Sequence, residues 1–227
     1  MARPDPREDD SARGLPRLPP GRHGLSRDFV ARNQRDRLAA GAISAIAERG
    51  YHEASVTEIC AAAGVSRRTF YSYFTSKEEC YLQTFDLVLE HLSEAMSQAG
   101  ADRGDWPERV HARLAAMLEV FAANPDLVRF TLVAPLRAGQ QIVTRYRLGL
   151  ERMLEILTED RPANGSVRQP STAIEQALVG GMMASITRKV ENGAEEQLAD
   201  LLPDLVELFL TPFVGRQAAA RAAAGSG

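Results

Sequence analysis

The sequence predicts an all-α protein, with an N-terminal three-helix unit built around a helix-turn-helix and a larger helical region after it. Alanine and leucine dominate the hydrophobic residues, which make up 44% of the chain, and runs of β-branched residues are few. This composition favours helices over strands. Residues 55–79 have the layout of a helix, a short turn, a second short helix and the start of a third, which is the arrangement of a helix-turn-helix.

We divide the chain of 227 residues into four segments. Residues 1–25 are rich in Pro, Arg, Gly and Asp, and their few apolar side chains cannot offset the entropy of ordering, so we expect a disordered arm. The helix-turn-helix domain is assigned to residues 26–76 and the larger helical domain to residues 77–215. Residues 216–227 are expected to form a disordered tail.

The first helix is expected to begin near Ser26 or Arg27 and to end at Glu48 or Arg49, closed by Gly50. Its apolar positions form a loose stripe, and its charged residues occupy the remaining faces.

The second helix begins with a capping box, in which Ser55 is the N-cap and Glu58 stands three residues later. The apolar face has the i, i+3, i+4, i+7 spacing of a helix and consists of Val56, Ile59, Cys60 and Ala63. Gly64 ends this helix, because the tight turn that follows needs a left-handed backbone.

The third helix is predicted to start after Ser66 as N-cap, with Val65 and Phe70 forming a hydrophobic staple. Phe70 and Phe74 lie four residues apart, so both should point into the core. The opposite, outward face then carries Arg67, Arg68, Tyr71 and Ser72. Two arginines and a tyrosine on a rigid, capped helix suit a nucleic-acid groove better than a core.

A second capping box, Ser76 with Glu79, opens a long helix that should reach about Gln98 and measure about 33 Å. Its buried stripe is predicted to be Tyr81, Phe85, Val88, Leu92 and Met96. The rest of the chain is expected to form helices over residues 105–123, 124–138, 140–157, 171–192 and 195–214, with a polar loop at 159–170. Because a proline inside a helix removes a hydrogen bond and clashes with the preceding turn, the last helix should break near Leu202 and restart at Pro203.

The charge distribution is uneven although the net charge is only −3. Residues 11–77 contain 11 Lys and Arg against 5 Asp and Glu, whereas residues 78–227 contain 14 against 21. A basic N-terminal part on an acidic body is typical of a protein that touches DNA at one end.

The helix-turn-helix carries a set of short motifs, namely Gly50-Tyr51, residues 55–59, residues 63–66, residues 69–71, Tyr73-Phe74 and Ser76-Lys77. With these motifs, residues 29–81 resemble the DNA-binding domain of the tetracycline-repressor (TetR) family of bacterial transcription regulators. A generic helix-turn-helix would not require the Tyr-x-Tyr-Phe-x-Ser-Lys continuation. The helical remainder is compatible with that family, whose C-terminal domains share architecture more than motif.

The resemblance implies a sequence-specific transcription regulator, a ligand-responsive repressor that binds a pseudo-palindromic operator as a homodimer. The alternative is a helical scaffold protein whose DNA binding is incidental. By resemblance, phosphate contacts map to Ser55, Ser66, Tyr71, Tyr73 and Lys77, and base contacts to Thr57, Arg67, Arg68 and Thr69, with Ser72 beside them. Arginine can bond guanine bidentately and the threonine methyl can meet thymine. Tyr73 could instead be a half-buried aromatic and Lys77 a solvated helix start.

A basic segment upstream of the first helix contains Arg22, His23 and Arg27. It resembles arms that reach into an adjacent minor groove, where the negative potential attracts arginine. A disordered basic linker that raises only nonspecific affinity is an equal alternative.

The family's C-terminal domain binds an effector and dimerises, so the resemblance implies both roles for residues 77–215. We expect the dimer interface to include Gly180, Gly181, Leu205, Leu208 and Phe209, although the glycines could pack only within the subunit. Candidates for an effector pocket, each of which could also be plain core, are Trp106, Met117, Phe121, Phe130, Tyr146, Met153 and Met183. The arginines at 129, 137, 145 and 147 could serve an anionic effector or lie on the surface.

No catalytic or cofactor motif stands out, so we expect neither an enzyme nor a metal or cofactor site. The four histidines lack metal-ligand spacing, and no nucleophile elbow, phosphate loop or dinucleotide fingerprint occurs. No apolar run approaches the roughly 20 residues that a membrane span requires. The N-terminus lacks the apolar core of a signal peptide, so we expect a cytoplasmic protein with Cys60 and Cys80 as buried thiols.

Overall fold

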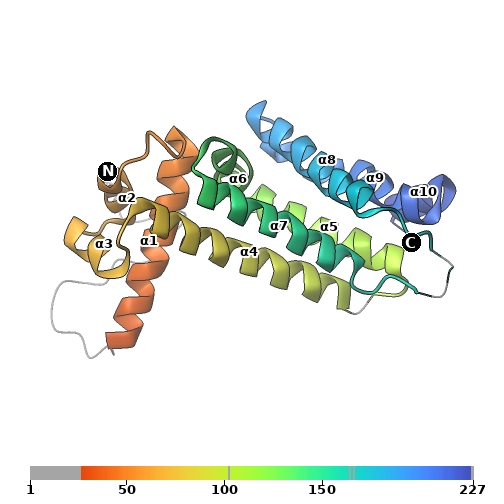
Figure 1. Ribbon diagram of the computed structural model, residues 1–227, viewed down its shortest axis with the longest axis horizontal. Coiled ribbons are helices and arrows are strands. Elements are labelled where there is room, and N and C mark those ends of the chain that lie inside the picture. Colours follow the sequence, from red (N-terminus) through yellow and green to blue (C-terminus); the bar gives the residue numbers. More distant parts are fainter. Residues whose placement is uncertain (1–26, 102, 164, 166, 226–227) are drawn as a thin grey trace, which may run out of the picture.

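The computed structural model describes residues 27–101, 103–163, 165 and 167–225, and all regular secondary structure in these residues is helical (Figure 1). Helices α1 to α3 form a head at one end of the molecule, and the remaining helices form an elongated body beside it. No helix among the described residues is both long and apolar enough to cross a membrane.

The head consists of α1 (Arg27–Arg49), α2 (Val56–Ala63) and α3 (Arg67–Tyr73). The first two helices pack closely, because a side chain at Gly41 would lie 2.7 Å from the backbone nitrogen of Ala63 and 2.8 Å from the carbonyl oxygen of Ile59. The contact between α1 and α2 therefore depends on the absence of a side chain at residue 41. The bounds of α1 also confirm the predicted start and end of the first helix.

The body is built on α4 (Lys77–Ala101), which runs from the head along the molecule beside α5 (Trp106–Ala123) and α7 (Gln140–Thr158) (Figure 1). The predicted stripe of α4 is confirmed, since all five side chains are buried. The second capping box differs in detail. Ser76 accepts a bond from the Glu79 N–H as expected (3.1 Å), but the Glu79 carboxylate reaches the N–H and hydroxyl of Thr75 rather than Ser76.

The expected helix over residues 124–138 is present as a helical segment over residues 125–137, but it is not α-helical throughout. The structure has a short α6 (Pro125–Val128), a π-helical turn (Arg129–Val133) and a 3₁₀ turn (Ala134–Arg137). Pro135 explains the difference, because it has no N–H to donate and its ring crowds the preceding turn, which widens into the π geometry.

The C-terminal part contains α8 (Thr172–Glu191), two 3₁₀ turns (Glu195–Gln197 and Ala199–Leu201), α9 (Leu202–Val214) and α10 (Arg216–Ala223). The predicted break is confirmed, since Pro203 lies in the first turn of α9. The expected disordered tail is wrong for residues 216–223, because α10 packs three alanines, Ala219, Ala222 and Ala223, into the core.

Two apolar clusters fill the interior. The cluster under the head contains Leu38, Ile59 and Phe70 and continues into the body through Tyr81 and Phe130. The second cluster fills the body, where the Trp106 indole N–H donates to the Leu157 carbonyl (2.9 Å). The head is therefore not packed on itself alone, and its core reaches the π-helical turn of the body.

Candidate DNA-binding surface

Helix α2 starts with the capping box that the sequence predicts. The Glu58 N–H donates to the Ser55 hydroxyl oxygen (3.3 Å), and the Ser55 N–H donates to the Glu58 carboxylate (2.8 Å). These hydrogen bonds hold the pKa of Glu58 below its usual value, and nearby Arg49 and Lys77 lower it further. Gly64 ends the helix with a left-handed backbone at φ 62°, as expected.

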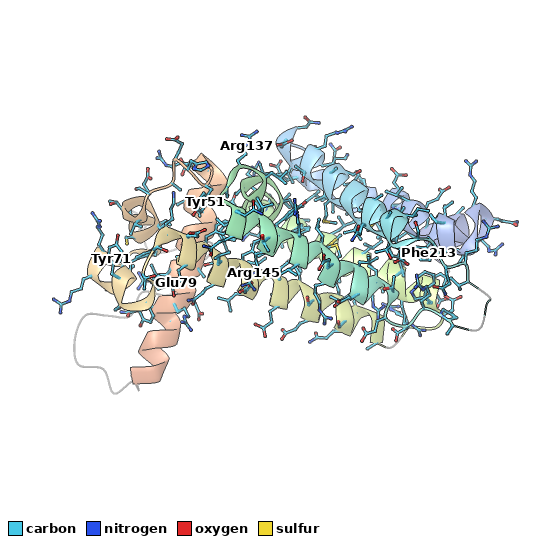
Figure 2. All side chains as sticks on the ribbon, viewed as in Figure 1. Tyr51, Tyr71, Glu79, Arg137, Arg145 and Phe213 are labelled. Atoms are coloured by element: carbon cyan, nitrogen blue, oxygen red, sulfur yellow. The ribbon has the colours of Figure 1, made fainter. Side chains whose placement is uncertain are left out.

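Helix α3 presents the predicted outward face. Ser66 caps it by accepting a bond from the Thr69 N–H (3.0 Å), while Phe70 and Phe74 are buried. Arg67 and Arg68 are exposed, and Tyr71 is 51% exposed. Figure 2 shows Tyr71 at the end of the molecule that carries the head. The same fold that buries the two phenylalanines thus leaves two cations and a phenol free to meet a partner.

The other predicted contact residues differ in how available they are. Ser55, Thr57, Ser66 and Ser72 are exposed, although the Ser72 hydroxyl donates to the Thr69 carbonyl (2.6 Å). Thr69 is half-buried, and its hydroxyl lies 3.0 Å from that of Ser66. Tyr73 is half-buried, with its hydroxyl donating to the Gln34 side chain on α1 (3.1 Å), which is the aromatic role left open by the sequence.

Lys77 is the predicted contact whose surroundings differ most from expectation. Its ammonium group donates to the carbonyl oxygens of Tyr51 (2.6 Å), Ala54 (2.8 Å) and His52 (3.3 Å), and it lies 4.5 Å from the centre of the Tyr51 ring. Burial lowers the pKa of Lys77, while Glu53 and Glu58 oppose this shift. Lys77 is therefore half-buried and bonded, rather than a solvated helix start.

Sequence reasoning missed Arg37 as a member of this site. Its guanidinium on α1 donates to the Gly64 carbonyl (2.7 Å) and so supports the turn between α2 and α3. No local motif marks this residue, because the contact joins positions 27 residues apart. Of the predicted minor-groove arm, Arg22 and His23 lie outside the described residues, and Arg27 is the first residue of α1.

The residues expected to line an effector pocket are packed inside the core in this conformation. Tyr146 is half-buried, Met153 is 8% exposed, and the other five are 2% exposed or less, namely Trp106, Met117, Phe121, Phe130 and Met183. Arg129 and Arg145 form ion pairs with Glu195 (2.5 Å) and Asp86 (3.2 Å). These side chains thus serve the packing of the body.

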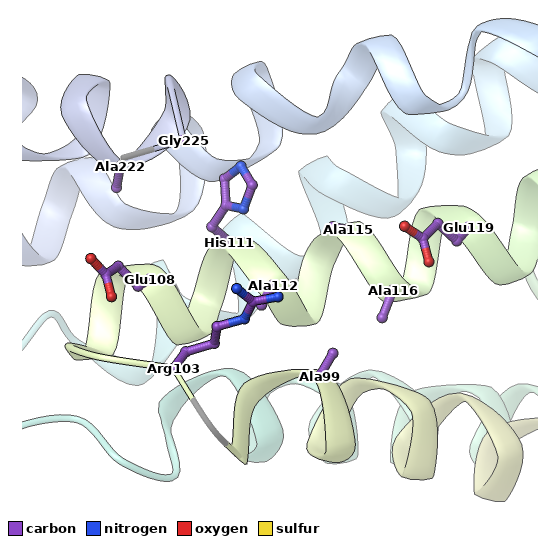
Figure 3. Close-up of a pocket in the computed structure, with 10 residues that line it drawn as sticks. All are labelled: Ala99, Arg103, Glu108, His111, Ala112, Ala115, Ala116, Glu119, Ala222 and Gly225. Carbon is purple, nitrogen blue, oxygen red and sulfur yellow. The ribbon is translucent and has the colours of Figure 1, made fainter. Parts of the chain in front are cut away.

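Two cavities in the body are lined by other residues. A groove of about 200 Å³ lies between α7 and α8 and is lined by Arg147, Leu150, Glu151, Leu154, Gln176 and Val179. A cavity of about 400 Å³ lies where α4, α5 and α10 meet, with an alanine-rich lining that also includes Arg103, Glu108, His111 and Glu119 (Figure 3). The first is lined by three apolar side chains together with Arg147, Glu151 and Gln176, and the second also mixes charges of both signs.

The predicted dimer residues fall on two different faces. Leu205 and Phe209 are buried within the subunit, so their assignment to an exposed interface is wrong; residues four apart share the inner face of α9. Leu208 is 41% exposed, and a side chain at Gly181 would lie 3.8 Å from it, while one at Gly180 would meet no neighbour. Among the described residues, no cluster of three His, Cys, Asp or Glu could hold a metal ion.

Comparison with known proteins places this geometry in a family. Residues 38–84 match the model of the bacterial regulatory proteins of the tetR family. The fatty acid metabolism regulator protein of Bacillus subtilis is 22% identical over 175 residues, which cover 75% of this chain and 90% of that protein. The transcriptional activator FasR of Mycolicibacterium smegmatis is 33% identical over 86 residues, or 38% of this chain and 39% of the activator.

The fold agrees with this assignment. The crystal structure of FadR from Bacillus subtilis, in complex with stearoyl-CoA, superimposes with a TM-score of 0.70 at 20% identity and covers 78% of this chain and 98% of that chain. Residues 38–84, which match the family model, contain α2, α3 and the start of α4. They therefore include the capped helix α3 with its two exposed arginines. The head of this chain therefore matches the DNA-binding domain of the bacterial regulatory proteins of the tetR family, and the chain as a whole shares the fold of FadR.

Proposed function

We propose that two copies of this chain bind a pseudo-palindromic operator, with α3 of each copy in the major groove, and that a small molecule bound in the body releases it. The observation that carries the proposal is the geometry of α3, a capped helix with a buried aromatic face and an exposed face of Arg67, Arg68 and Tyr71. A groove reader needs a rigid helix that presents donors outward, and this helix meets both requirements.

Arg67 and Arg68 are proposed as base readers, together with Thr57 and Thr69. A bidentate arginine–guanine contact contributes roughly 1–3 kcal/mol of discrimination. Ser55 and Ser66 are proposed as phosphate contacts because they are the N-caps of α2 and α3, where backbone N–H groups favour anions. Tyr71 and Ser72 are proposed as phosphate contacts because both are exposed on α3.

The dimer is proposed to form through the outward faces of α8 and α9. Ile174 on α8 is 47% exposed and Leu208 on α9 is 41% exposed, and Leu208 faces Gly181 of α8. An apolar strip on paired helices suits a second copy of itself. A two-fold dimer would then set the half-sites about 34–36 Å apart, one turn of DNA.

The effector is proposed to be a long-chain acyl-CoA that binds in the groove between α7 and α8. This rests on two relatives whose names concern fatty acid metabolism and stearoyl-CoA. It also rests on the groove, where Leu150, Leu154 and Val179 offer an apolar wall and Arg147 a cation for an anionic head. Methionines at positions 153, 182 and 183 lie in the adjoining core, and their flexible side chains can repack around a chain.

Release of the operator would be a shift between two conformations of the dimer, because a ligand moves such an equilibrium only by binding one state more tightly. We propose a repressor, so that ligand binding relieves repression. A regulator of this kind acts on chromosomal DNA and hence in the cytoplasm.

The first experiment is selection of bound duplexes from a random library, followed by affinity measurements at two salt concentrations. The proposal predicts an enriched inverted repeat. It also predicts that Arg67→Ala will relax the preference at particular base pairs, whereas equal loss across every operator variant would remove Arg67 as a base reader. Weak, steeply salt-dependent binding without enrichment would contradict operator recognition.

The dimer and the effector are tested separately. Leu208→Lys should shift the protein from dimer to monomer in sedimentation, and an unchanged dimer would place the interface elsewhere. Stearoyl-CoA should reduce operator binding in fluorescence anisotropy, whereas free coenzyme A should not. Arg147→Glu should weaken this response; release by both compounds, or by neither, would reject the proposed effector class.

A further inference from the structure

The turn between α1 and α2, residues 51–54, is held by one ammonium group. Lys77 is the first residue of α4, yet its Nζ atom donates to the carbonyl oxygens of Tyr51, His52 and Ala54. An ammonium group has three N–H donors, and three carbonyls accept from it here. In this conformation no donor remains for a phosphate.

The hydrogen bond from Lys77 to Ala54 joins the two ends of the helix-turn-helix. Ala54 immediately precedes the N-cap of α2, and Lys77 follows α3, so the 2.8 Å bond between them joins residues 23 positions apart. Helices α2 and α3, the two helices of the helix-turn-helix, lie between these two residues. The position of α3 relative to α4 therefore depends on the hydrogen bonds between the Lys77 ammonium group and the turn at residues 51–54.

The same turn is attached to the body on its other side. The Tyr51 ring packs edge-on against that of Tyr81 with centroids 5.3 Å apart, and the Tyr81 hydroxyl donates to the Phe130 carbonyl (2.7 Å). Phe130 belongs to the π-helical turn, and the His52 imidazole Nε2 donates to the Arg137 carbonyl in the 3₁₀ turn after it. Tyr51 is labelled in Figure 2 at this junction between head and body.

The chemistry of the site favours a lysine over other cations. Its compact ammonium group can point toward three carbonyls at once and also lie 4.5 Å from an aromatic ring centre. The planar guanidinium of arginine has a fixed fork of donors and cannot reproduce this arrangement. A residue that only needed to reach a phosphate would tolerate either cation.

We propose that Lys77 is a positioning residue rather than an operator phosphate contact. It holds the turn at residues 51–54 and so sets the angle at which α3 meets DNA, and through Tyr51 and Tyr81 it connects that angle to the π-helical turn of the body. The inference rests on the proposed operator binding by α3.

The test compares Lys77→Met and Lys77→Arg with Arg68→Met, an exposed cation on α3. Each variant is titrated with the selected operator duplex and with a scrambled duplex over a series of salt concentrations. If Lys77 positions α3, Lys77→Met and Lys77→Arg should both weaken operator binding by about tenfold or more, as expected for loss of charge-assisted bonds. The slope of log affinity against log salt should stay that of the wild type. The ratio of operator to scrambled affinity should fall.

A phosphate contact predicts a different pattern. Lys77→Met would then reduce the salt slope by about 0.9 and weaken both duplexes alike, while Lys77→Arg would bind like the wild type. That result would overturn the proposal. Arg68→Met provides the reference for a lost DNA-facing charge in the same assay.

Two further measurements separate this inference from other failures. If Lys77→Met does not fold by circular dichroism, Tyr51→Leu removes the ring while keeping the cation, and it should lower operator affinity with an unchanged slope; an unaltered affinity would reject the clamp. If wild-type protein enriches no duplex, the proposed operator binding fails, whereas an enriched operator with a phosphate-like pattern at Lys77 rejects this inference alone.

Discussion

Gly41→Ala is a sharp test of how the head is packed, because local and tertiary effects predict opposite outcomes. Gly41 lies in the middle of α1, where alanine is favoured over glycine by about 1 kcal/mol in an isolated helix. In the folded head, however, a Cβ atom at this position would lie 2.7 Å from the Ala63 nitrogen, 2.8 Å from the Ile59 carbonyl oxygen and 2.9 Å from the Ala63 Cβ.

The magnitude follows from which atoms would have to move. Two of the three neighbours are backbone atoms of α2, so no side-chain rotation can relieve the overlap. Ordinary contacts between heavy atoms lie at about 3.5–4.0 Å, so α1 and α2 would have to separate by roughly 1 Å. Overpacking of this kind typically costs about 1–3 kcal/mol. Because only a movement of the whole helix can relieve the overlap, we expect the upper part of that range and a net loss of stability despite the helix propensity of alanine.

The assay is urea unfolding followed by circular dichroism, with the thermal midpoint measured at a fixed heating rate. For a chain of this size, a loss of about 2 kcal/mol corresponds to a midpoint lower by roughly 4–8 °C. Ser44→Ala is the matched control, since Ser44 is exposed on the same helix and this change should be neutral or slightly stabilising. A Gly41→Ala protein as stable as the wild type would refute the close approach of α1 and α2.

Three further predictions concern single contacts. Tyr81→Phe should lower the free energy of unfolding by about 1–2 kcal/mol in urea titrations, because the Phe130 carbonyl loses its buried donor; an unchanged midpoint would contradict this bond. Glu58 has a pKa lowered by the hydrogen bond from the N-cap backbone N–H, so its charge stabilises the fold above its usual pKa of 4.5 and this contribution is lost as the pH falls through the lower folded value. Wild type should therefore be more stable than Glu58→Gln at pH 7, and the difference should shrink as the pH is lowered below 4.5. Cys60 and Cys80 are both free and buried, and desolvation raises the pKa of Cys80 to about 12. Both should react with a thiol reagent only after unfolding, and rapid native-state labelling of either would show that it is accessible.

The head could be predicted in detail because its signals are local. The N-caps at Ser55 and Ser66, the left-handed Gly64 and the inward pair Phe70 and Phe74 all involve residues within four positions of one another. Backbone groups at helix ends need partners nearby in the chain, so short motifs determine where such helices start and stop. The outward face of α3 follows directly from these constraints.

The body was predicted less well, because similar apolar patterns serve different purposes there. Leu205, Leu208 and Phe209 look alike in the sequence, yet only Leu208 reaches the surface. The alanines of α10 read as a tail but are buried against the body. Which side of a helix is covered depends on neighbours that are distant in the chain, and no local rule supplies them.

The helical class, the boundaries of the head helices and the outward cations of α3 could be predicted from local patterns, since each of these follows from interactions within one or two helical turns. Three contacts depend on how the helices pack: Lys77 bonds to the turn at residues 51–54, Arg37 donates to the Gly64 carbonyl, and Gly41 lies against the backbone of α2. These contacts join residues that lie 18 to 27 positions apart. They exist only because burial of the apolar faces first brings the helices together, which leaves polar side chains to bond whichever backbone groups they then meet.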